Sequence, residues 1–226
     1  MIVNLPKLAE GNTAEIFQLD NNRILKLFKS GFSKESMLHE YYNHQVVSGL
    51  LDSAPNLYEM VEENGRFGYI MEQIKGTNLA ERLLNEVTFT DAMEQFICLH
   101  KEWNKEAPAE VVSYKDWMKA LVGNRESASE LLEKIHCLPE GNTLCHGDFH
   151  PYNILVTEEN KPVVIDFANV CRAPKKYDIA RTYFLMEEAG VKQMAEVYLE
   201  QMQTKFEEIQ EFYKVIAQLR KFELEP

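Results

Sequence analysis

The chain has 226 residues, of which 45% are hydrophobic and 27% are charged, and its formal net charge is -12. Its length and apolar content are sufficient for a folded protein with more than one lobe. The acidic balance argues against a nucleic-acid partner, because phosphates favour basic surfaces, and no segment is predicted to be a signal peptide or to span a membrane.

The first predicted elements are short strands. Apolar and polar residues alternate through residues 15–19 and 23–28, and the turn Asp20-Asn21-Asn22 separates these two runs. Before them, residues 7–10 lead into the loop Gly11-Asn12-Thr13-Ala14. The pattern predicts a strand, a loop, a strand, a turn and a third strand.

Lys26 lies in the last of these strands, on the same face as its apolar second neighbours. One interpretation is a surface lysine that points to solvent. The other is a lysine on an apolar face, which needs a negatively charged partner because an unpaired buried charge is costly. The helix predicted over residues 34–51 offers Glu35 and Glu40 as partners, and either could instead be a solvated helix residue.

A hairpin and then a helical region follow. Residues 56–61 and 67–72 flank Asn64-Gly65, a dipeptide that favours a tight hairpin turn. Apolar spacings of three and four predict helices beyond it, with Ser127 as one of the caps. These helices are expected within residues 78–85, 90–103, 114–121 and 127–135, from residue 174 onward and from residue 191 onward.

The second half of the chain contains the polar run His146-Gly147-Asp148-Phe149-His150-Pro151-Tyr152-Asn153. A predicted hairpin over residues 154–165 follows and would bring Asn153 and Asp166 together at one end. Phosphoryl transfer from ATP needs a carboxylate that accepts a hydroxyl proton and separate oxygen ligands for Mg²⁺. Asp148 suits the first task, and Asn153 and Asp166 suit the second. The alternative is a cluster that satisfies turns in an ordinary α/β core.

The block His-Gly-Asp-x-His-Pro-x-Asn-Ile-Leu resembles the catalytic loop of the aminoglycoside phosphotransferase and choline kinase family, and Ile165-Asp166-Phe167 resembles its metal-binding segment. Members of this family are small-molecule kinases with a protein-kinase-like fold. The resemblance implies an α+β, two-lobed architecture. A nucleotide-gripping lobe of antiparallel sheet and one helix would cover residues 1–73, and a mainly helical lobe with the catalytic loop and substrate site would cover residues 74–226.

The resemblance also implies roles for individual residues. Asp148 would be the catalytic base, with Asn153 and Asp166 as metal ligands. Lys26 and Glu40, which the alignment favours over Glu35, would hold the phosphates of ATP. Further nucleotide contacts are implied for the loop Gly11, Asn12 and Thr13, which has one glycine where protein kinases have three, and for the main chain of Glu72, Gln73 and Ile74. His146 and a buried Asp178 would brace the catalytic loop, whereas His100 is given no chemistry.

These features predict a kinase that moves the γ-phosphoryl group of MgATP to a hydroxyl of a small molecule such as an aminoglycoside, an amino alcohol or a sugar. The four cysteines lack metal-ligand spacing, which indicates reduced thiols and a cytoplasmic location. A catalytically idle nucleotide-binding or scaffolding module is one alternative. A protein kinase is the other, and against it stand Gly147 and Ala168, where protein kinases have Arg and Gly, and the short interval between Asp166 and Asp178.

Overall fold

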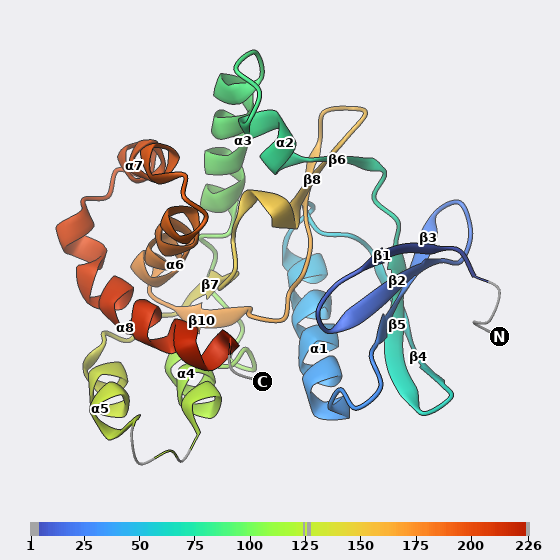
Figure 1. Ribbon diagram of the computed structural model, residues 1–226, viewed down its shortest axis with the longest axis horizontal. Coiled ribbons are helices and arrows are strands. Elements are labelled where there is room, and N and C mark those ends of the chain that lie inside the picture. Colours follow the sequence, from blue (N-terminus) through green and yellow to red (C-terminus); the bar gives the residue numbers. More distant parts are fainter. Residues whose placement is uncertain (1–4, 124, 126–127, 225–226) are drawn as a thin grey trace. The chain divides into compact units, whose positions relative to one another are not determined.

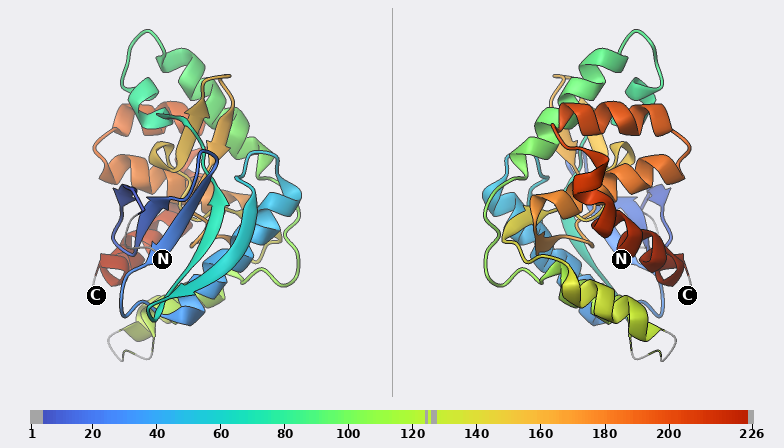
Figure 2. Two further views of the ribbon diagram at one scale, coloured as in Figure 1. Left: turned by 90° about the vertical axis from the view of Figure 1, so that its right-hand side faces the viewer. Right: turned by 90° about the vertical axis from the view of Figure 1, so that its left-hand side faces the viewer.

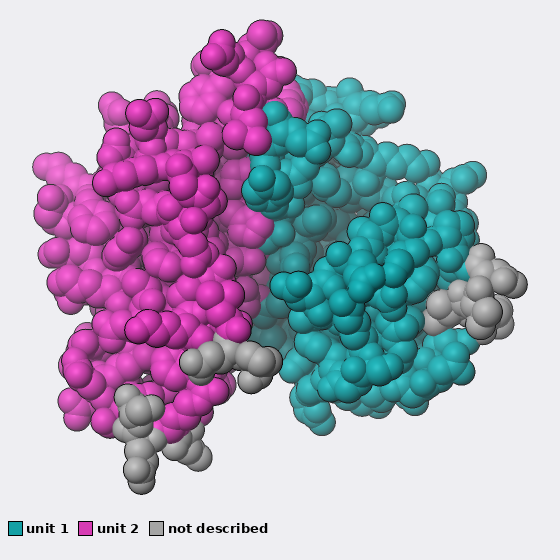
Figure 3. All heavy atoms as spheres, viewed as in Figure 1, with its two compact units in different colours: residues 1–81, 152–168 teal, residues 82–151, 169–226 magenta. Residues whose placement is uncertain are grey.

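The structure is a computed structural model that describes residues 5–123, 125 and 128–224. Its contacts divide the chain into two compact units, coloured teal and magenta in Figure 3. The first unit comprises residues 1–81 and 152–168, and the second comprises residues 82–151 and 169–226. The lobes predicted from the sequence, residues 1–73 and 74–226, are defined by their roles, whereas these units are defined by contacts. The lobe boundaries therefore stay a prediction.

An antiparallel sheet forms most of the first unit (Figure 1). Its strands follow the order β1-β2-β3-β5-β4, and they match the runs predicted from alternation. They are β1 (Lys7–Glu10), β2 (Ala14–Gln18), β3 (Arg23–Phe28), β4 (Leu57–Glu63) and β5 (Arg66–Glu72). The turn between β4 and β5 places Asn64 at φ 54° and Gly65 at φ 72°. A two-residue hairpin loop needs positive φ at both positions, and this explains why Asn-Gly predicted the turn.

Helix α1 (Lys34–Leu50) is the long helix of the first unit. The Ser33 side chain caps its N-terminus by accepting a hydrogen bond from the Ser36 amide at 3.2 Å. Met37 on this helix is buried in one cluster with Phe28 and Tyr69 of the sheet. Burial of these large apolar side chains is what holds the helix against the sheet.

A second, smaller sheet in the first unit has the order β6-β8-β9. Its strands are β6 (Gly76–Asn78), β8 (Ile154–Thr157) and β9 (Pro162–Val164). The β8–β9 pair is the hairpin predicted after Asn153, and a single 3₁₀ turn, Pro151–Asn153, leads into it. The Val164 amide donates to the Ser53 carbonyl at 2.7 Å, which ties the hairpin to the segment between α1 and β4.

The second unit is mainly helical, and its small sheet pairs β7 (Thr143–Cys145) with β10 (Cys171–Ala173). The helices are α3 (Phe89–Glu102), α4 (Tyr114–Val122), α5 (Ser129–Cys137), α6 (Lys175–Glu188), α7 (Lys192–Gln201) and α8 (Phe206–Leu224), while α2 (Leu79–Leu83) spans the boundary between the units. Every residue from Tyr177 to Met186 of α6 is buried. This helix is therefore the centre of the second unit, and α7 and α8 pack against it (Figures 1 and 2).

The apolar spacing after residue 191 continues through two helices rather than one. Gln203 adopts φ 52°, and the Thr204 amide donates to the Leu199 carbonyl at 3.0 Å, the pattern of a helix end with a left-handed residue. The expected cap Ser127 lies outside the described residues. Within those residues, no helix is both long and apolar enough to cross a membrane. The α+β class with an antiparallel N-terminal sheet and a helical remainder is confirmed.

Candidate active site

The loop that carries Asp148 is held by helix α6 of the same unit. The amides of His146 and Gly147 each donate to the Asp178 carboxylate at 2.9 Å. Asp178 is 3% exposed, and His100 Nε2 lies 3.1 Å from its Oδ2 atom. The predicted role of Asp178 as a buried brace of this loop is thus confirmed, and His100 also has a structural role because its Nδ1 pairs with the Tyr198 hydroxyl at 2.8 Å.

Gly147 occupies a position that only glycine fits. Its φ is 74°, in the left-handed region, and a Cβ atom there would lie 2.2 Å from the Asn169 carbonyl oxygen. Because that contact is with backbone, a side chain could not move it aside. The residue before Asp148 is therefore glycine for a steric reason.

Asp148 lies beside His150 and Arg181. His150 Nε2 is 3.5 Å from its carboxylate, and an Arg181 amino group is 3.9 Å away. Burial raises the pKa of Asp148. The hydrogen bond with His150 and the electrostatic interactions with His150 and Arg181 lower it by more, so that the pKa falls to about 2. Asp148 is consequently ionised at neutral pH, as a group that accepts a proton must be. His146 turns back to accept the Asp148 amide at 3.2 Å, which agrees with its predicted bracing role.

The first unit brings together Lys26, Glu40 and Asp166. Lys26 forms a short ion pair with Glu40, and its Nζ atom lies 3.5 Å from Asp166 Oδ1. Burial lowers the pKa of Lys26, but the Glu40 and Asp166 charges raise it more, so that the ammonium stays protonated. The expectation of a Glu partner on the helix is confirmed, with Glu40 rather than Glu35 in that position.

Tyr69 belongs to this group, although no sequence pattern marked it. It faces Lys26 across the β3–β5 pair, and its hydroxyl donates to Glu40 Oε1 at 2.6 Å. Nothing in the sequence indicated that its hydroxyl would meet a carboxylate.

Asn153 and Asp166 lie at the same end of the β8–β9 hairpin. The Ile165 amide donates to the Asn153 carbonyl at 2.9 Å, so the residue before Asp166 is hydrogen-bonded to Asn153. The Asp166 side chain is 46% exposed and its φ is 68°. These oxygen donors suit a hard cation such as Mg²⁺, which takes few protein ligands and keeps water and phosphate oxygens. No group of three His, Cys, Asp or Glu side chains that could form a protein-only metal cage occurs in the described part of the chain.

The other predicted nucleotide contacts lie in the first unit as well. Gly11, Asn12 and Thr13 are exposed, in a loop that the Gly11 amide closes by donating to the Ala14 carbonyl at 2.9 Å. In residues 72–74, the amides of Glu72 and Gln73 donate within the protein, to the Asn56 and Asn22 carbonyls, each at 2.8 Å. The amides of Glu72 and Gln73 are therefore already paired within the protein.

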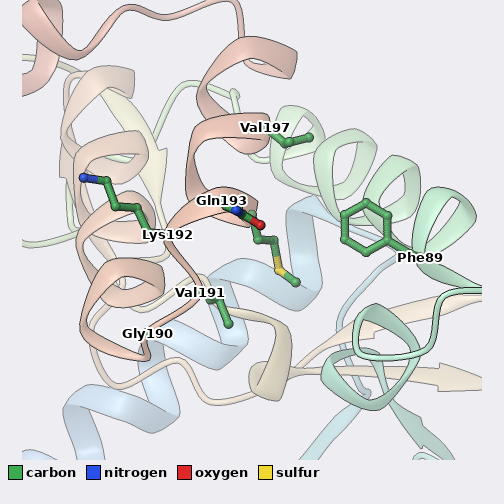
Figure 4. Close-up of a pocket in the computed structure, with 7 residues that line it drawn as sticks. Phe89, Gly190, Val191, Lys192, Gln193 and Val197 are labelled. Carbon is green, nitrogen blue, oxygen red and sulfur yellow. The ribbon is translucent and has the colours of Figure 1, made fainter.

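An open groove of about 630 Å³ lies beside α7 in the second unit (Figure 4). Its lining is mostly apolar and consists of Phe89, Gly190, Val191, Lys192, Gln193, Met194 and Val197. Lys192 is the one charged residue in that lining, so the groove has no acid–base pair, and we assign it no catalytic role.

The fold is kinase-like. The model of the phosphotransferase enzyme family matches residues 5–212, and the chain belongs to that family. It is accordingly a phosphotransferase with an alcohol group as acceptor. A comparison with curated protein sequences found no match.

Solved structures share the fold at low sequence identity. The aminoglycoside phosphotransferase APH(4)-Ia, as a thermostable mutant, is 16% identical with a TM-score of 0.71, over 97% of this chain and 86% of that one. An aminoglycoside-3'-phosphotransferase of type VIII is 17% identical with a TM-score of 0.67, over 95% and 91% of the two chains. The choline kinase LicA from Streptococcus pneumoniae is 16% identical with a TM-score of 0.65, over 97% and 84%.

Proposed function

We propose that this protein transfers the γ-phosphoryl group of ATP to a hydroxyl group of a small molecule. The observation that carries the proposal is the complete set of polar residues that this chemistry needs. The first unit has the Lys26–Glu40 ion pair beside Asp166, and the second has Asp148 on a loop that α6 braces. Asn153 follows Asp148 by five residues in the sequence, so one short segment carries both.

Each residue has a separate task in this proposal. Lys26, kept charged and fixed by Glu40, would bind the phosphates of ATP, and Asn153 and Asp166 would hold Mg²⁺. The bound metal ion would neutralise phosphate charge. The loop Gly11, Asn12 and Thr13 and the main chain of Glu72, Gln73 and Ile74 would contact the nucleotide. Structures of relatives in complex with AMP-PNP or ADP and hygromycin B, and with GDP and kanamycin, support a nucleotide and a polyhydroxy acceptor.

Asp148 would accept the proton of the acceptor hydroxyl. A carboxylate with a pKa of about 2 is a weak base, but phosphoryl transfer through a loose transition state asks mainly for positioning of the nucleophile. An ionised carboxylate that orients the hydroxyl by accepting its hydrogen bond meets that requirement. The proton moves to Asp148 as the oxygen–phosphorus bond forms, and ADP leaves.

The two alternatives make different predictions. An idle nucleotide-binding module would bind MgATP without turnover, yet none of Lys26, Asp148, Asn153 and Asp166 has been replaced. A protein kinase needs a segment on which a peptide docks. Here β10 and the start of α6 occupy the interval between Asp166 and Asp178, which argues for a small acceptor. A cytoplasmic location is part of the proposal and rests on the cysteine pattern.

The test is ADP release from MgATP across a panel of aminoglycosides, amino alcohols, sugars and hydroxy amino acids, with a protein substrate included. We expect acceptor-dependent ADP release that Asp148→Ala lowers by about 10²–10⁴-fold, the range that a positioned general base contributes. Binding of MgATP to that variant should be retained. Release that continues unchanged in Asp148→Ala would contradict the assignment, and binding without release across the whole panel would favour the idle module.

A further inference from the structure

Arg181 is a buried cation with no place in the roles assigned so far. It is 2% exposed and lies on α6, three residues after Asp178, so both side chains leave the same side of the helix. A buried guanidinium is costly unless its donors and its charge are matched. Its partners therefore show what it does.

One partner is the catalytic loop. Arg181 Nε donates to the Gly147 carbonyl at 3.0 Å, and Gly147 is the residue before Asp148. The Nη2 group of the same guanidinium lies 3.9 Å from Asp148 Oδ1. That separation is longer than a hydrogen bond, so Arg181 attracts the catalytic carboxylate as a charge while it holds the preceding carbonyl by a hydrogen bond.

The other partner is Glu223 on α8. Arg181 Nη2 lies 2.8 Å from Glu223 Oε1 and donates to Oε2 at 3.0 Å. Two carboxylates thus face one amino group, and Glu223 is the nearer by more than 1 Å. Because Coulomb attraction rises as the distance shortens, Glu223 takes the larger share of the Arg181 charge.

Glu223 is itself fixed in position. Arg220 Nη1, one helical turn earlier on α8, lies 2.8 Å from Glu223 Oε2, and Arg220 Nη2 lies 2.7 Å from Glu188 on α6. Charges of alternating sign therefore connect Asp148, Arg181, Glu223, Arg220 and Glu188 across the two helices.

We propose that Arg181 and Glu223 are positioning residues for Asp148, and that Glu223 keeps the guanidinium from closing onto the catalytic carboxylate. The inference rests on the proposed role of Asp148 as the base. Arg181 fixes the backbone before Asp148 and helps to keep the carboxylate ionised, whereas Glu223 holds the guanidinium at a distance where it does not compete with the acceptor hydroxyl. The end of α8 thereby takes part in catalysis without contact with the acceptor.

The other titratable groups near Asp148 agree with this division. His150 approaches Oδ2 at 3.5 Å and Arg181 approaches Oδ1 at 3.9 Å, while His146 pairs with the Asp148 amide. The Arg181 charge contributes to the low pKa of Asp148, after the larger effect of His150. A guanidinium in direct contact would add a hydrogen bond to Oδ1, which at 3.9 Å it does not make.

The test is a double-mutant cycle of Glu223→Gln and Arg181→Met, with Arg181→Lys as the conservative variant. Glu208→Gln is the matched control, because Glu208 pairs with Lys176 at 2.7 Å and so joins the same two helices through an exposed ion pair. The kcat for ADP release and the KM for MgATP would be measured for each variant, with the acceptor found in the panel or with water as acceptor. Thermal unfolding would confirm that each variant is folded.

We expect Glu223→Gln to lower kcat by roughly 10–100-fold, the scale on which misplacement of a reacting group lowers a rate. The KM for MgATP should change by less than about twofold, since the effect lies in the transition state. Arg181→Met should lower kcat. Arg181→Lys should have a kcat between those of Arg181→Met and the natural chain, since an ammonium lacks the paired donors of a guanidinium. Glu223→Gln should have little further effect in the Arg181→Met background, because it acts through Arg181.

Unchanged kcat in Glu223→Gln, or effects of Glu223→Gln and Arg181→Met that simply add, would overturn the inference while leaving the proposed function intact. An equal loss of kcat in Glu208→Gln would also overturn it, because any break between α6 and α8 would then suffice. Turnover retained in Asp148→Ala, or a natural chain that releases no ADP, would instead remove the proposed function and this inference with it.

Discussion

His44 is a histidine in a position that an apolar residue could fill. It is 0% exposed, its ring centroid lies 4.7 Å from that of Phe167, and its Nε2 atom is 2.9 Å from the Pro55 carbonyl oxygen. A neutral imidazole donates one hydrogen bond there. Burial lowers the pKa of His44 from 6.5 to about 4, against the raising effect of the Pro55 hydrogen bond, and the Lys26 charge adds to the lowering.

This histidine should make folding pH-dependent. Because the folded pKa lies below the unfolded one, the unfolded state takes up the proton first, and the stabilisation present above pH 6.5 is lost as the pH falls towards 4. The difference between the two pKa values corresponds to about 3 kcal/mol. Urea denaturation between pH 4 and 7.5 should show this loss in the natural chain and a flatter dependence in His44→Gln. The exposed His136→Gln is the control, and equal pH slopes in all three chains would contradict the prediction.

Sequence reasoning at the residue scale succeeded where the pattern was local. Lys26 on an apolar strand face required a carboxylate, and the following helix offered Glu35 and Glu40. The family resemblance favoured Glu40, which is the partner. Arg181 could not be predicted in the same way. Its partners Gly147 and Glu223 are 34 and 42 residues distant in the chain, and only the packing of α6 brings them together.

Helix α6 is the element on which the loop of Asp148 depends. From one helix, Asp178 accepts the amides of His146 and Gly147, Arg181 holds the Gly147 carbonyl, and Thr182 donates to the Phe149 carbonyl at 2.9 Å. Residues at positions i, i+3 and i+4 share a helix face, so this spacing lets one element satisfy successive polar groups of one loop.

Replacing Asp178 by Asn should therefore loosen the loop. Both carboxylate oxygens now accept hydrogen bonds, and an amide can offer only one oxygen, so a buried N–H would face an NH₂ group. We expect a loss of about 1–3 kcal/mol in unfolding free energy, the penalty of an unsatisfied buried donor, together with a lower kcat. Urea denaturation and ADP release measure these effects. Asp116→Asn, at an exposed carboxylate in the first turn of α4, is the control, and a stability loss no larger than that of the control would contradict the role of Asp178.

The elements themselves were predicted to different degrees. Both hairpins were predicted because Asn64-Gly65 fixes one turn, and because apolar strands flank a polar turn in the other. The division between α7 and α8 was not, since the apolar spacing continues across it and the left-handed Gln203 has no glycine or proline to mark it. A backbone conformation that a non-glycine residue adopts under tertiary constraint leaves no trace in composition.

At the scale of the whole molecule, the proposed site residues are divided between the two compact units. Lys26, Glu40, Asn153 and Asp166 belong to the first, and Asp148 with its α6 brace belongs to the second. If the assigned roles hold, nucleotide binding and proton transfer are separable by mutation, because each depends on contacts within its own unit. Stabilisation by MgATP then measures nucleotide binding to the first unit alone, whereas turnover requires residues of both units.

Thermal unfolding with MgATP tests this separation. A ligand at 100 times its Kd adds about 2.7 kcal/mol to the stability of the state that binds it. The natural chain and Asp148→Ala should both gain this stabilisation, since Asp148 would contact the acceptor rather than the nucleotide. Lys26→Met and Asp166→Ala should lose it, through the missing phosphate contact and metal ligand, while Lys161→Met, an exposed lysine between β8 and β9, should behave as the natural chain. Full stabilisation of Lys26→Met by MgATP would show that the ammonium serves only its ion pairs with Glu40 and Asp166, and the first unit would then need another phosphate contact.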